Sequence, residues 1–209
     1  MKKEKQLFVC ELFEDLEGEG RFQGYPTFFV RLSECNLRCN WCDTKESYAK
    51  GKPYGITKLA KMASESDCCN ISITGGEPLL QKSGVKVLIK ALRKKCPGKK
   101  ITVETNGSIS VAGLNADNVS MDIKLLSSGV SEKMMLSNLK VLKPKDQVKL
   151  VAGSLADLRY AQAVLKKYRT KAEIIVQPVF GRIKFSAIRE FILRRGLKWR
   201  AMVQLHKMK

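Results

Sequence analysis

The sequence predicts an α/β fold in which a mostly parallel sheet forms an incomplete β/α barrel. Three observations predict it: β-branched runs alternate with segments of helical period, polar motifs directly follow those runs, and the chain has only 209 residues. A closed eight-stranded α/β barrel usually needs about 250 residues, so this length suits a barrel with an open side that admits a substrate. The same length fits one domain, 1–209, rather than two independent cores.

Short runs rich in β-branched or aromatic residues are expected to be strands, and the apolar period between them indicates helices. The expected strands are Thr27–Leu32, Asn70–Thr74, Lys100–Glu104, Asn118–Ile123, Gln147–Val151, Glu173–Val176 and Arg200–Leu205. The expected helices are roughly Thr57–Ser64, Val85–Lys95, Glu132–Leu139, Leu155–Tyr168 and Phe185–Arg195. About six β/α units result, and their strand ends are expected to gather at one rim.

The composition excludes some classes of protein and leaves others open. The formal net charge is +19, which would attract nucleic acid, acidic proteins or anionic substrates without identifying any of them. No aromatic-interleaved basic motif accompanies the charge, so a basic surface is favoured over a nucleic-acid groove. No apolar run approaches the roughly 20 residues that span a bilayer, and Met1–Gln6 leads into a strand-like segment. A cytoplasmic protein is therefore expected, with no membrane contact and no direct nucleic-acid binding.

A cysteine loop directly follows the first expected strand. Cys35, Cys39 and Cys42 have the spacing C-x3-C-x2-C, and such a tight group in a reducing compartment suggests metal binding. A zinc site normally has four protein ligands, and the single histidine, His206, lies at the far end of the chain. In a [4Fe-4S] cluster, three thiolates leave one iron open to another ligand. Buried structural thiols and a degenerate zinc knuckle remain alternatives on spacing alone.

The cysteine loop and the segment Thr74-Gly75-Gly76-Glu77-Pro78, together, resemble the radical S-adenosylmethionine (SAM) enzymes. The resemblance implies a partial TIM-like β/α barrel of the radical SAM type, with a [4Fe-4S] cluster on the three cysteines and SAM on the open iron. Gly75 and Gly76 suit this role, because a backbone without Cβ atoms lets a ligand approach closely. The resemblance also implies that no catalytic side chain is needed, since the radical comes from the cofactor.

Nearly the whole chain is similar to the 7-carboxy-7-deazaguanine synthase family. The resemblance rests on Leu16-Glu17-Gly18-Glu19-Gly20, on Asp43-Thr44 after the third cysteine, and on Gln204-Leu205-His206-Lys207. It implies Mg²⁺ on Thr44. It implies substrate contacts at Leu16, Glu17, Gly18, Glu19, Arg31, Thr74 and His206. It implies cofactor contacts at Gly75, Gly76, Glu77, Glu104, Asn106, Asp122, Ile123, Lys124, Gln177, Pro178, Val179 and Phe180.

Two positions depart from the family pattern: Glu17 stands where Gln is usual, and Glu34 stands where Gly is common. A carboxylate lacks the donors of an amide, so the substrate contact at Glu17 is expected to differ or to use its backbone. Arg31 suits a carboxylated substrate, because a guanidinium can donate two parallel hydrogen bonds to a carboxylate.

The implied activity converts 6-carboxy-5,6,7,8-tetrahydropterin to 7-carboxy-7-deazaguanine with release of ammonia, a step toward queuosine and archaeosine. The implied partners are the pterin substrate, an electron donor such as flavodoxin or ferredoxin, and a second copy in a homodimer. Two alternatives remain: an activase that makes a glycyl radical on a partner protein, and a basic RNA-binding module with a zinc knuckle.

Overall fold

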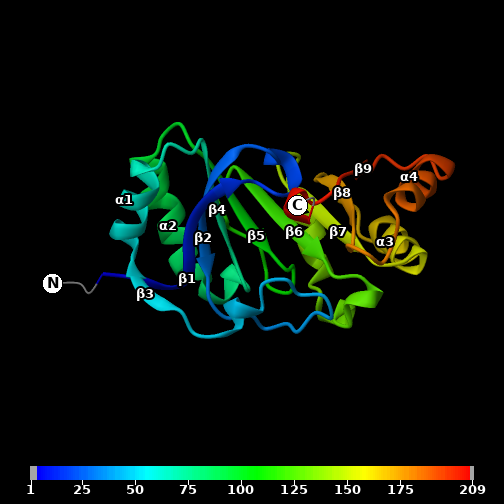
Figure 1. Ribbon diagram of the computed structural model, residues 1–209, viewed down its shortest axis with the longest axis horizontal. Helices are drawn as coiled ribbons and strands as arrows, with labels where there is room; N and C mark the ends of the chain where they lie inside the picture. The colour runs from blue at the N-terminus through cyan, green and yellow to red at the C-terminus, as the bar shows by residue number, and fades with distance from the viewer. Residues whose placement is uncertain (1–3, 208–209) are drawn as a thin grey trace.

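In the computed structural model, which describes residues 4–207, one open nine-stranded sheet forms the framework (Figure 1). Met1–Lys3 and the last two residues of the expected domain lie outside this range. The strands have the order β3-β1-β2-β4-β5-β6-β7-β8-β9. Their bounds are β1 (Gln6–Leu16), β2 (Pro26–Leu32), β3 (Lys52–Gly55), β4 (Asn70–Gly75), β5 (Lys100–Thr105), β6 (Asn118–Ile123), β7 (Gln147–Ala152), β8 (Glu173–Pro178) and β9 (Arg200–Ala201).

Seven strands of this sheet run parallel, from β2 through β4 to β9, while β1 pairs antiparallel with β2 and β3. Within the described residues the two edge strands, β3 and β9, are not neighbours, so the curved sheet does not close. The predicted α/β class and incomplete barrel are therefore confirmed. The long N-terminal strand β1 and the short β3 were absent from the predicted strands.

The α-helices lie on the outer side of the sheet. Their bounds are α1 (Ile56–Glu65), α2 (Lys82–Lys95), α3 (Leu155–Lys167) and α4 (Phe185–Arg194). Helices α1 and α2 pack together at one end of the sheet, and α3 and α4 at the other (Figure 1). Ser154 begins α3 because its side chain accepts a hydrogen bond from the backbone N–H of Asp157, at 3.2 Å. Among residues 4–207, no helix has both the length and the apolar character needed to cross a membrane.

Alternation along the parallel strands separates an apolar face from a polar one. In β5, Ile101 and Val103 are fully buried in the main core, whereas the next residue, Glu104, faces the interior of the open barrel. In β6, Met121 joins the core and Asp122 faces the interior. Each fully buried Ile or Val stabilises the fold by about 1.5–3 kcal/mol. The pattern that builds the core therefore also presents polar side chains at the strand ends.

The expected helix Glu132–Leu139 is wrong. The structure has two short 3-10 helices there, η5 (Ser131–Lys133) and η6 (Leu136–Lys140). Asn138 explains the difference, because its side chain donates to the carbonyls of Gly107 and Ile109, at 3.2 and 2.9 Å, and accepts from Val111 N, at 3.1 Å. These tertiary hydrogen bonds fix the segment against the loop after β5 and take precedence over helical period.

The expected strand Arg200–Leu205 is too long, since β9 ends at Ala201 and the chain then forms the short 3-10 helix η7 (Leu205–Lys207). The backbone N–H of Leu205 donates to the carbonyl of Gly18 at 3.0 Å. Contact with the β1–β2 hairpin therefore draws η7 away from the sheet edge and over the interior of the sheet (Figure 1).

Candidate active site

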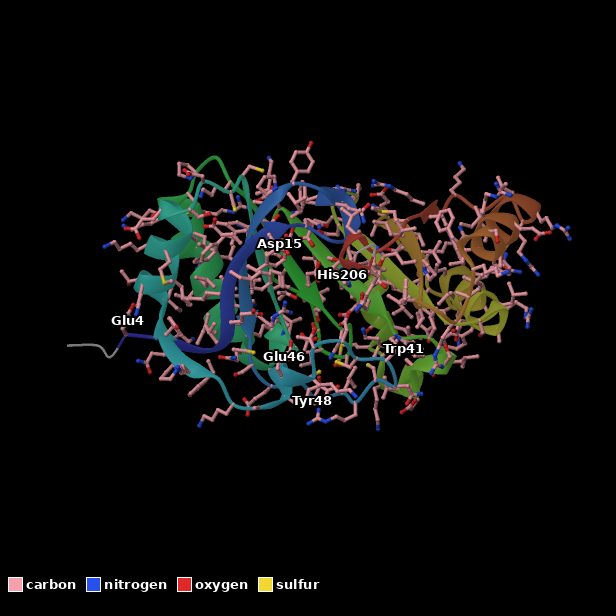
Figure 2. The ribbon with its side chains drawn as sticks, in the orientation of Figure 1. Glu4, Asp15, Trp41, Glu46, Tyr48 and His206 are labelled. Atoms are coloured by element: carbon pink, nitrogen blue, oxygen red, sulfur yellow. The ribbon has the colours of Figure 1, made fainter. Side chains whose placement is uncertain are left out.

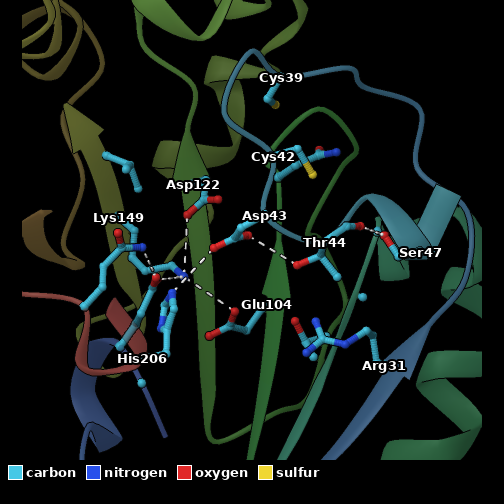
Figure 3. Close-up of a pocket in the computed structure, with 18 of the residues that line it drawn as sticks. Arg31, Cys39, Cys42, Asp43, Thr44, Ser47, Glu104, Asp122, Lys149 and His206 are labelled. Atoms are coloured by element: carbon cyan, nitrogen blue, oxygen red, sulfur yellow. Dashed lines mark hydrogen bonds and ion pairs between the residues drawn. The ribbon is translucent and has the colours of Figure 1, made fainter. Parts of the chain in front are cut away.

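A pocket of about 630 Å³ lies at the carboxyl ends of the parallel strands, where the cysteine loop, the β1–β2 hairpin and η7 meet (Figure 3). Its walls combine thiols, carboxyls and cationic side chains with aromatic rings. Trp41 belongs to the cysteine loop and Tyr48 follows it, and Figure 2 shows both residues apart from His206, which lies on the C-terminal segment. The strand ends thus form the rim that the sequence predicts.

Cys35, Cys39 and Cys42 all line this pocket, as free thiols. Burial raises the pKa of the Cys35 and Cys39 thiols, although Leu37 N donates to Cys35 Sγ at 3.5 Å. Within the described residues no three Cys, His, Asp or Glu side chains converge on a point that would hold a single metal ion. A cubane cluster does not need such convergence, because each thiolate binds a different iron.

Gly75 and Gly76 pack the end of β4 against the cysteine loop. Gly75 has φ +144°, and a Cβ atom built on it would lie 2.1 Å from the carbonyl oxygen of Leu32. A Cβ atom on Gly76 would lie 2.2 Å from the carbonyl oxygen of Glu34. No other residue type fits at either position without moving backbone. The two glycines therefore allow the backbone around the cysteine loop to pack directly against the end of β4.

Glu34 itself has φ +69°, in the left-handed region. Its backbone N–H donates to the carbonyl of Ser47 at 2.6 Å, and its carbonyl accepts from Glu77 N at 2.8 Å. These two hydrogen bonds hold the strained conformation, which costs a non-glycine residue about 1–2 kcal/mol. The geometry explains why glycine suits this position and shows that glutamate is accommodated there.

Glu77 is fully buried behind the pocket and joins the ends of β4 and β5. Its carboxyl group accepts hydrogen bonds from Thr105 Oγ1 and Leu79 N, both at 2.8 Å, and from Asn106 N at 2.7 Å. Burial raises the pKa of Glu77, and these donors oppose the shift. Glu77 therefore positions the ends of the two strands. Asn106 connects them to the cysteine loop, because its Nδ2 lies 3.8 Å from Cys35 Sγ.

On the other side of the pocket, the β1–β2 hairpin supplies Glu17 and Glu19. The backbone of Glu17 is committed to the hairpin, since its N–H donates to Tyr25 O at 2.9 Å and its carbonyl accepts from Gly24 N at 2.8 Å. Its side chain is 6% exposed, and burial, together with the nearby Glu104 carboxylate, raises the pKa of Glu17 to about 8. A contact from Glu17 to a ligand therefore has to come from its side chain.

Arg31 and Thr44 lie on the same wall of the pocket (Figure 3). The guanidinium of Arg31 lies 5.1 Å from the ring centroid of Phe13, and its Nε donates to Glu11 at 2.9 Å. Thr44 Oγ1 donates to Asp43 Oδ1 at 3.3 Å. Arginine, carboxylate and hydroxyl groups together suit an anionic ligand held with a hard cation.

The C-terminal segment is tied to the cysteine loop through Asp43. Lys207 Nζ lies 2.9 Å and His206 Nε2 3.5 Å from Asp43 Oδ2. The hydrogen bond from His206 lowers the pKa of Asp43, and Lys207 lowers it further. The same segment reaches the hairpin, where Gln204 Nε2 donates to Glu19. These contacts enclose the pocket between the two ends of the chain.

Comparison with known proteins places the chain in a family. Residues 30–149 match the radical SAM superfamily. The 7-carboxy-7-deazaguanine synthase of Methanospirillum hungatei is 41% identical over 200 residues, which cover 95% of this chain and 83% of the relative. The synthase of Clostridium acetobutylicum is 36% identical over 95% of this chain and 94% of the relative. The chain belongs to the 7-carboxy-7-deazaguanine synthase family.

The fold agrees with this family. The crystal structure of QueE from Escherichia coli superposes with a TM-score of 0.76 over 95% of this chain and 94% of that chain, at 23% identity. A synthase from Thermoplasma acidophilum is 32% identical over 96% of both chains. The barrel is thus of the radical SAM type, as predicted, and the similarities do not favour the glycyl-radical activase or the zinc-knuckle module.

The cofactors predicted from the sequence, a [4Fe-4S] cluster, SAM and Mg²⁺, are those of the synthase family. The residues present fit them. Three free thiols face one pocket, while the chain's other four cysteines lie away from it.

The structure brings most of the predicted site residues of this synthase-family chain together. The pocket is lined by Leu16, Glu17, Gly18, Glu19, Arg31, Cys35, Cys39, Cys42, Thr44, Thr74, Gly75, Gly76, Glu104, Asn106, Asp122, Lys124, Val179, Phe180 and His206. Four predicted cofactor residues do not line it: Glu77, Ile123, Gln177 and Pro178. Strand alternation turns Ile123 toward the core between the pocket-facing Asp122 and Lys124.

The sequence reasoning missed other pocket residues. Lys149 on β7 is the most notable, and Phe13 and Tyr48 also line the pocket. Asp43 lines it too, and it had been named as part of a family motif but without a role of its own. The available signal was the spacing of Gln147 and Lys149, the two polar residues of β7. Residues spaced by two share one face of a strand, and this face points into the barrel.

Proposed function

We propose that the chain catalyses the reaction for which its relatives are named, converting 6-carboxy-5,6,7,8-tetrahydropterin to 7-carboxy-7-deazaguanine with release of ammonia. The observation that carries the proposal is one pocket shared by three free thiols and an arginine–carboxylate set. The similarity to named synthases over 95% of the chain supports it. The product is a 7-deazapurine, a precursor of modified nucleosides.

The proposal assigns the cluster to Cys35, Cys39 and Cys42. When bound, the cluster and SAM supply the radical that starts the reaction. Gly75 and Gly76 hold the cysteine loop at the end of β4, which keeps the three thiols on one pocket wall. The polar strand ends nearby, at Asn106 and Asp122 among others, are proposed to bind SAM. No part of this assignment requires a side chain to act as acid or base.

The substrate is assigned to the opposite part of the pocket. Arg31 is proposed to bind the substrate carboxylate, because its guanidinium is fixed by Glu11 and stacks on Phe13. Thr44 is proposed to hold Mg²⁺ beside it, through an oxygen ligand of the kind that this cation prefers. Glu17, Glu19 and His206 complete the wall. Enclosure by the hairpin and η7 would exclude water from the reacting atoms.

The protein's associations form part of the same proposal. An external one-electron donor, such as flavodoxin or ferredoxin, is required because the reaction starts with an electron. A homodimer and a cytoplasmic location are proposed with it, and so is the organisation of 1–209 as one radical SAM domain.

The function is tested by anaerobic assay of the reconstituted protein with reductant, SAM and the carboxytetrahydropterin. We expect 7-carboxy-7-deazaguanine and ammonia from the wild type, and neither product from Cys39→Ala, which should also lose cluster iron. Cys69→Ala is the matched control, because Cys69 is exposed and lies outside the pocket. A wild type that cleaves SAM without forming the deazaguanine would contradict the proposed substrate. A Cys39→Ala protein with full iron and activity would contradict the cluster assignment.

A further inference from the structure

Lys149 is a buried cation in the wall of the pocket, and neither the motifs nor the family resemblance gave it a role. It is only 5% exposed. Its Nζ lies 2.7 Å from Glu19 Oε2, 3.4 Å from Glu104 Oε2 and 3.8 Å from Asp122 Oδ1 (Figure 3). Burial of an ammonium is unfavourable unless opposite charges surround it. The three carboxylates provide that charge.

The three carboxylates come from three separate elements. Glu19 belongs to the β1–β2 hairpin, Glu104 to the end of β5 and Asp122 to the end of β6, where it pairs in register with Lys149. Lys149 therefore connects the hairpin to the sheet at the point where substrate is proposed to bind. A second contact supports the same junction: Gln147 Oε1 accepts from Arg21 N at 2.8 Å.

The pKa of Lys149 and the pKa of its partner Glu104 depend on each other. Burial alone would lower the pKa of Lys149, but Glu104, Glu19 and Asp122 outweigh it and raise the pKa well above its ordinary value. Burial raises the pKa of Glu104, and Lys149 is the first of the groups that oppose this shift. Without the ammonium, Glu104 would hold its proton to higher pH. The other acidic and basic side chains that line the pocket are Asp15, Glu17, Arg31, Asp43, Glu46, Lys124, His206 and Lys207.

We propose that Lys149 is a positioning residue for the substrate: its ammonium holds the carboxyl group of Glu19, from the hairpin, beside that of Glu104, from the end of β5. An ionised carboxylate only accepts hydrogen bonds, whereas a protonated one also donates. The proposed pterin substrate carries an amino group and ring N–H groups, which are donors that an ionised carboxylate receives strongly. The inference rests on the proposed function, and Lys149 acts through its two partners rather than on the reacting atoms.

The test compares Lys149→Met, which keeps the length of the side chain without its charge, with Lys149→Arg, which keeps the charge. The control for loss of one lysine is Lys90→Met, on the exposed side of α2. Each protein is reconstituted with its cluster, and substrate binding is measured by anaerobic calorimetry in addition to turnover. Wild-type product formation tests the proposed function, and the differences between variants test the role of Lys149.

We expect Lys149→Met to keep its cluster iron and to unfold in one cooperative transition, at a lower temperature than the wild type because three carboxyl groups lose their cation. It should bind the pterin roughly tenfold or more weakly. The acid limb of its kcat/KM profile should move upward by about one pH unit as Glu104 protonates more readily. Lys149→Arg should restore most of the affinity for the pterin and return the acid limb of the kcat/KM profile to its wild-type pH. Lys90→Met should match the wild type.

A double variant separates positioning from a direct role. Because Lys149 is proposed to act through Glu19, Lys149→Met added to Glu19→Gln should weaken binding far less than it does alone. Full additivity would overturn the proposal, and so would unchanged affinity and pH profile in Lys149→Met. If the neutral variants failed to fold while Lys149→Arg worked normally at every pH, Lys149 would be purely structural, which would equally overturn it.

Discussion

Glu17 brings an ionisable group to a place where the family resemblance predicts an amide. The carboxyl is buried, and it shares the pocket with Glu104 and Glu19. Burial is the largest cause that raises the pKa of Glu17 to about 8, and the carboxylate of Glu104 adds to it. At neutral pH the group is therefore protonated, and a protonated carboxyl donates one hydrogen bond and accepts another, as an amide does. The departure at Glu17 is chemically smaller than the change of residue type suggests.

We expect Glu17→Gln to raise the free energy of unfolding by an amount that grows between about pH 5 and about pH 8. In the unfolded chain Glu17 loses its proton near the ordinary glutamate pKa of 4.5, whereas the folded protein keeps it to about 8. The protonated Glu17 therefore contributes its full stabilisation to the wild type below about pH 4.5. This contribution to the free energy of unfolding is lost as the pH rises from 4.5 to about 8. The slope is at most about 1.4 kcal/mol per pH unit.

Thermal denaturation of Glu17→Gln and the wild type across that pH range measures the effect. The exposed Glu132→Gln serves as the control for the substitution itself. A stability difference that does not change with pH would show that Glu17 ionises normally in the folded protein.

The β1–β2 hairpin and η7 act as one structural unit, although they lie at opposite ends of the chain. Leu205 N donates to Gly18 O at 3.0 Å, and Gln23 Nε2 donates to both Gly18 O and Val203 O, at 2.8 and 2.6 Å. Gly18 permits this contact, because a Cβ atom there would lie 2.7 Å from His206 Nδ1. The position of His206 in the pocket therefore depends on the absence of a side chain at Gly18.

We expect Gly18→Ala to raise KM for the substrate by roughly tenfold while the cluster and the fold remain intact, because His206 and η7 must move aside. The fold should tolerate the change, since the clashing atom belongs to the end of a side chain. The matched control is Gly98→Ala, since a Cβ atom on Gly98 meets nothing within 4 Å. Steady-state kinetics with iron content and melting temperature decide the result. An unchanged KM would mean that His206 does not contact substrate.

The core elements were predictable because their signals are local. Parallel strands such as β4 and β7 are short apolar runs between helical segments, and their ends and order follow from that pattern. The strand β1 was harder to predict, because its exposed face carries charged residues and the strands that pair with it come later in the chain. The segment around Asn138 has helical period, but its side-chain hydrogen bonds to a distant loop decide its structure.

The site was predictable where a motif specifies it. The cysteines and Gly75-Gly76 could be located because their spacing is distinctive, and the structure gathers them in one pocket. Lys149 could not be assigned a role from a motif, because a single lysine in a strand acquires its role only when three carboxylates from other elements surround it. Glu77 shows the converse: the motif identified it, but its donors make it part of the framework behind the pocket.

Positive and negative side chains are unevenly distributed over the molecule. The chain has a net charge of +19, whereas several of its carboxyl groups line the pocket. Glu17, Glu19, Glu104 and Asp122 all line the pocket. Helix α2 ends in Arg93-Lys94-Lys95, and α3 ends in Lys166-Lys167. Such a surface attracts an acidic protein from beyond contact distance, and salt weakens this attraction.

We therefore expect reduction of the cluster by an acidic flavodoxin to slow by roughly tenfold or more as ionic strength rises from about 0.01 to about 1 M, because the Debye length falls from about 30 to about 3 Å. Stopped-flow absorbance of the cluster under anaerobic conditions measures the rate. The control reductant is the reduced methyl viologen cation, which the same surface repels, so its rate should hold or increase with salt. If both reductants slowed equally, salt would be acting on the cluster or the fold, and the positive surface would have no part in recruiting the donor.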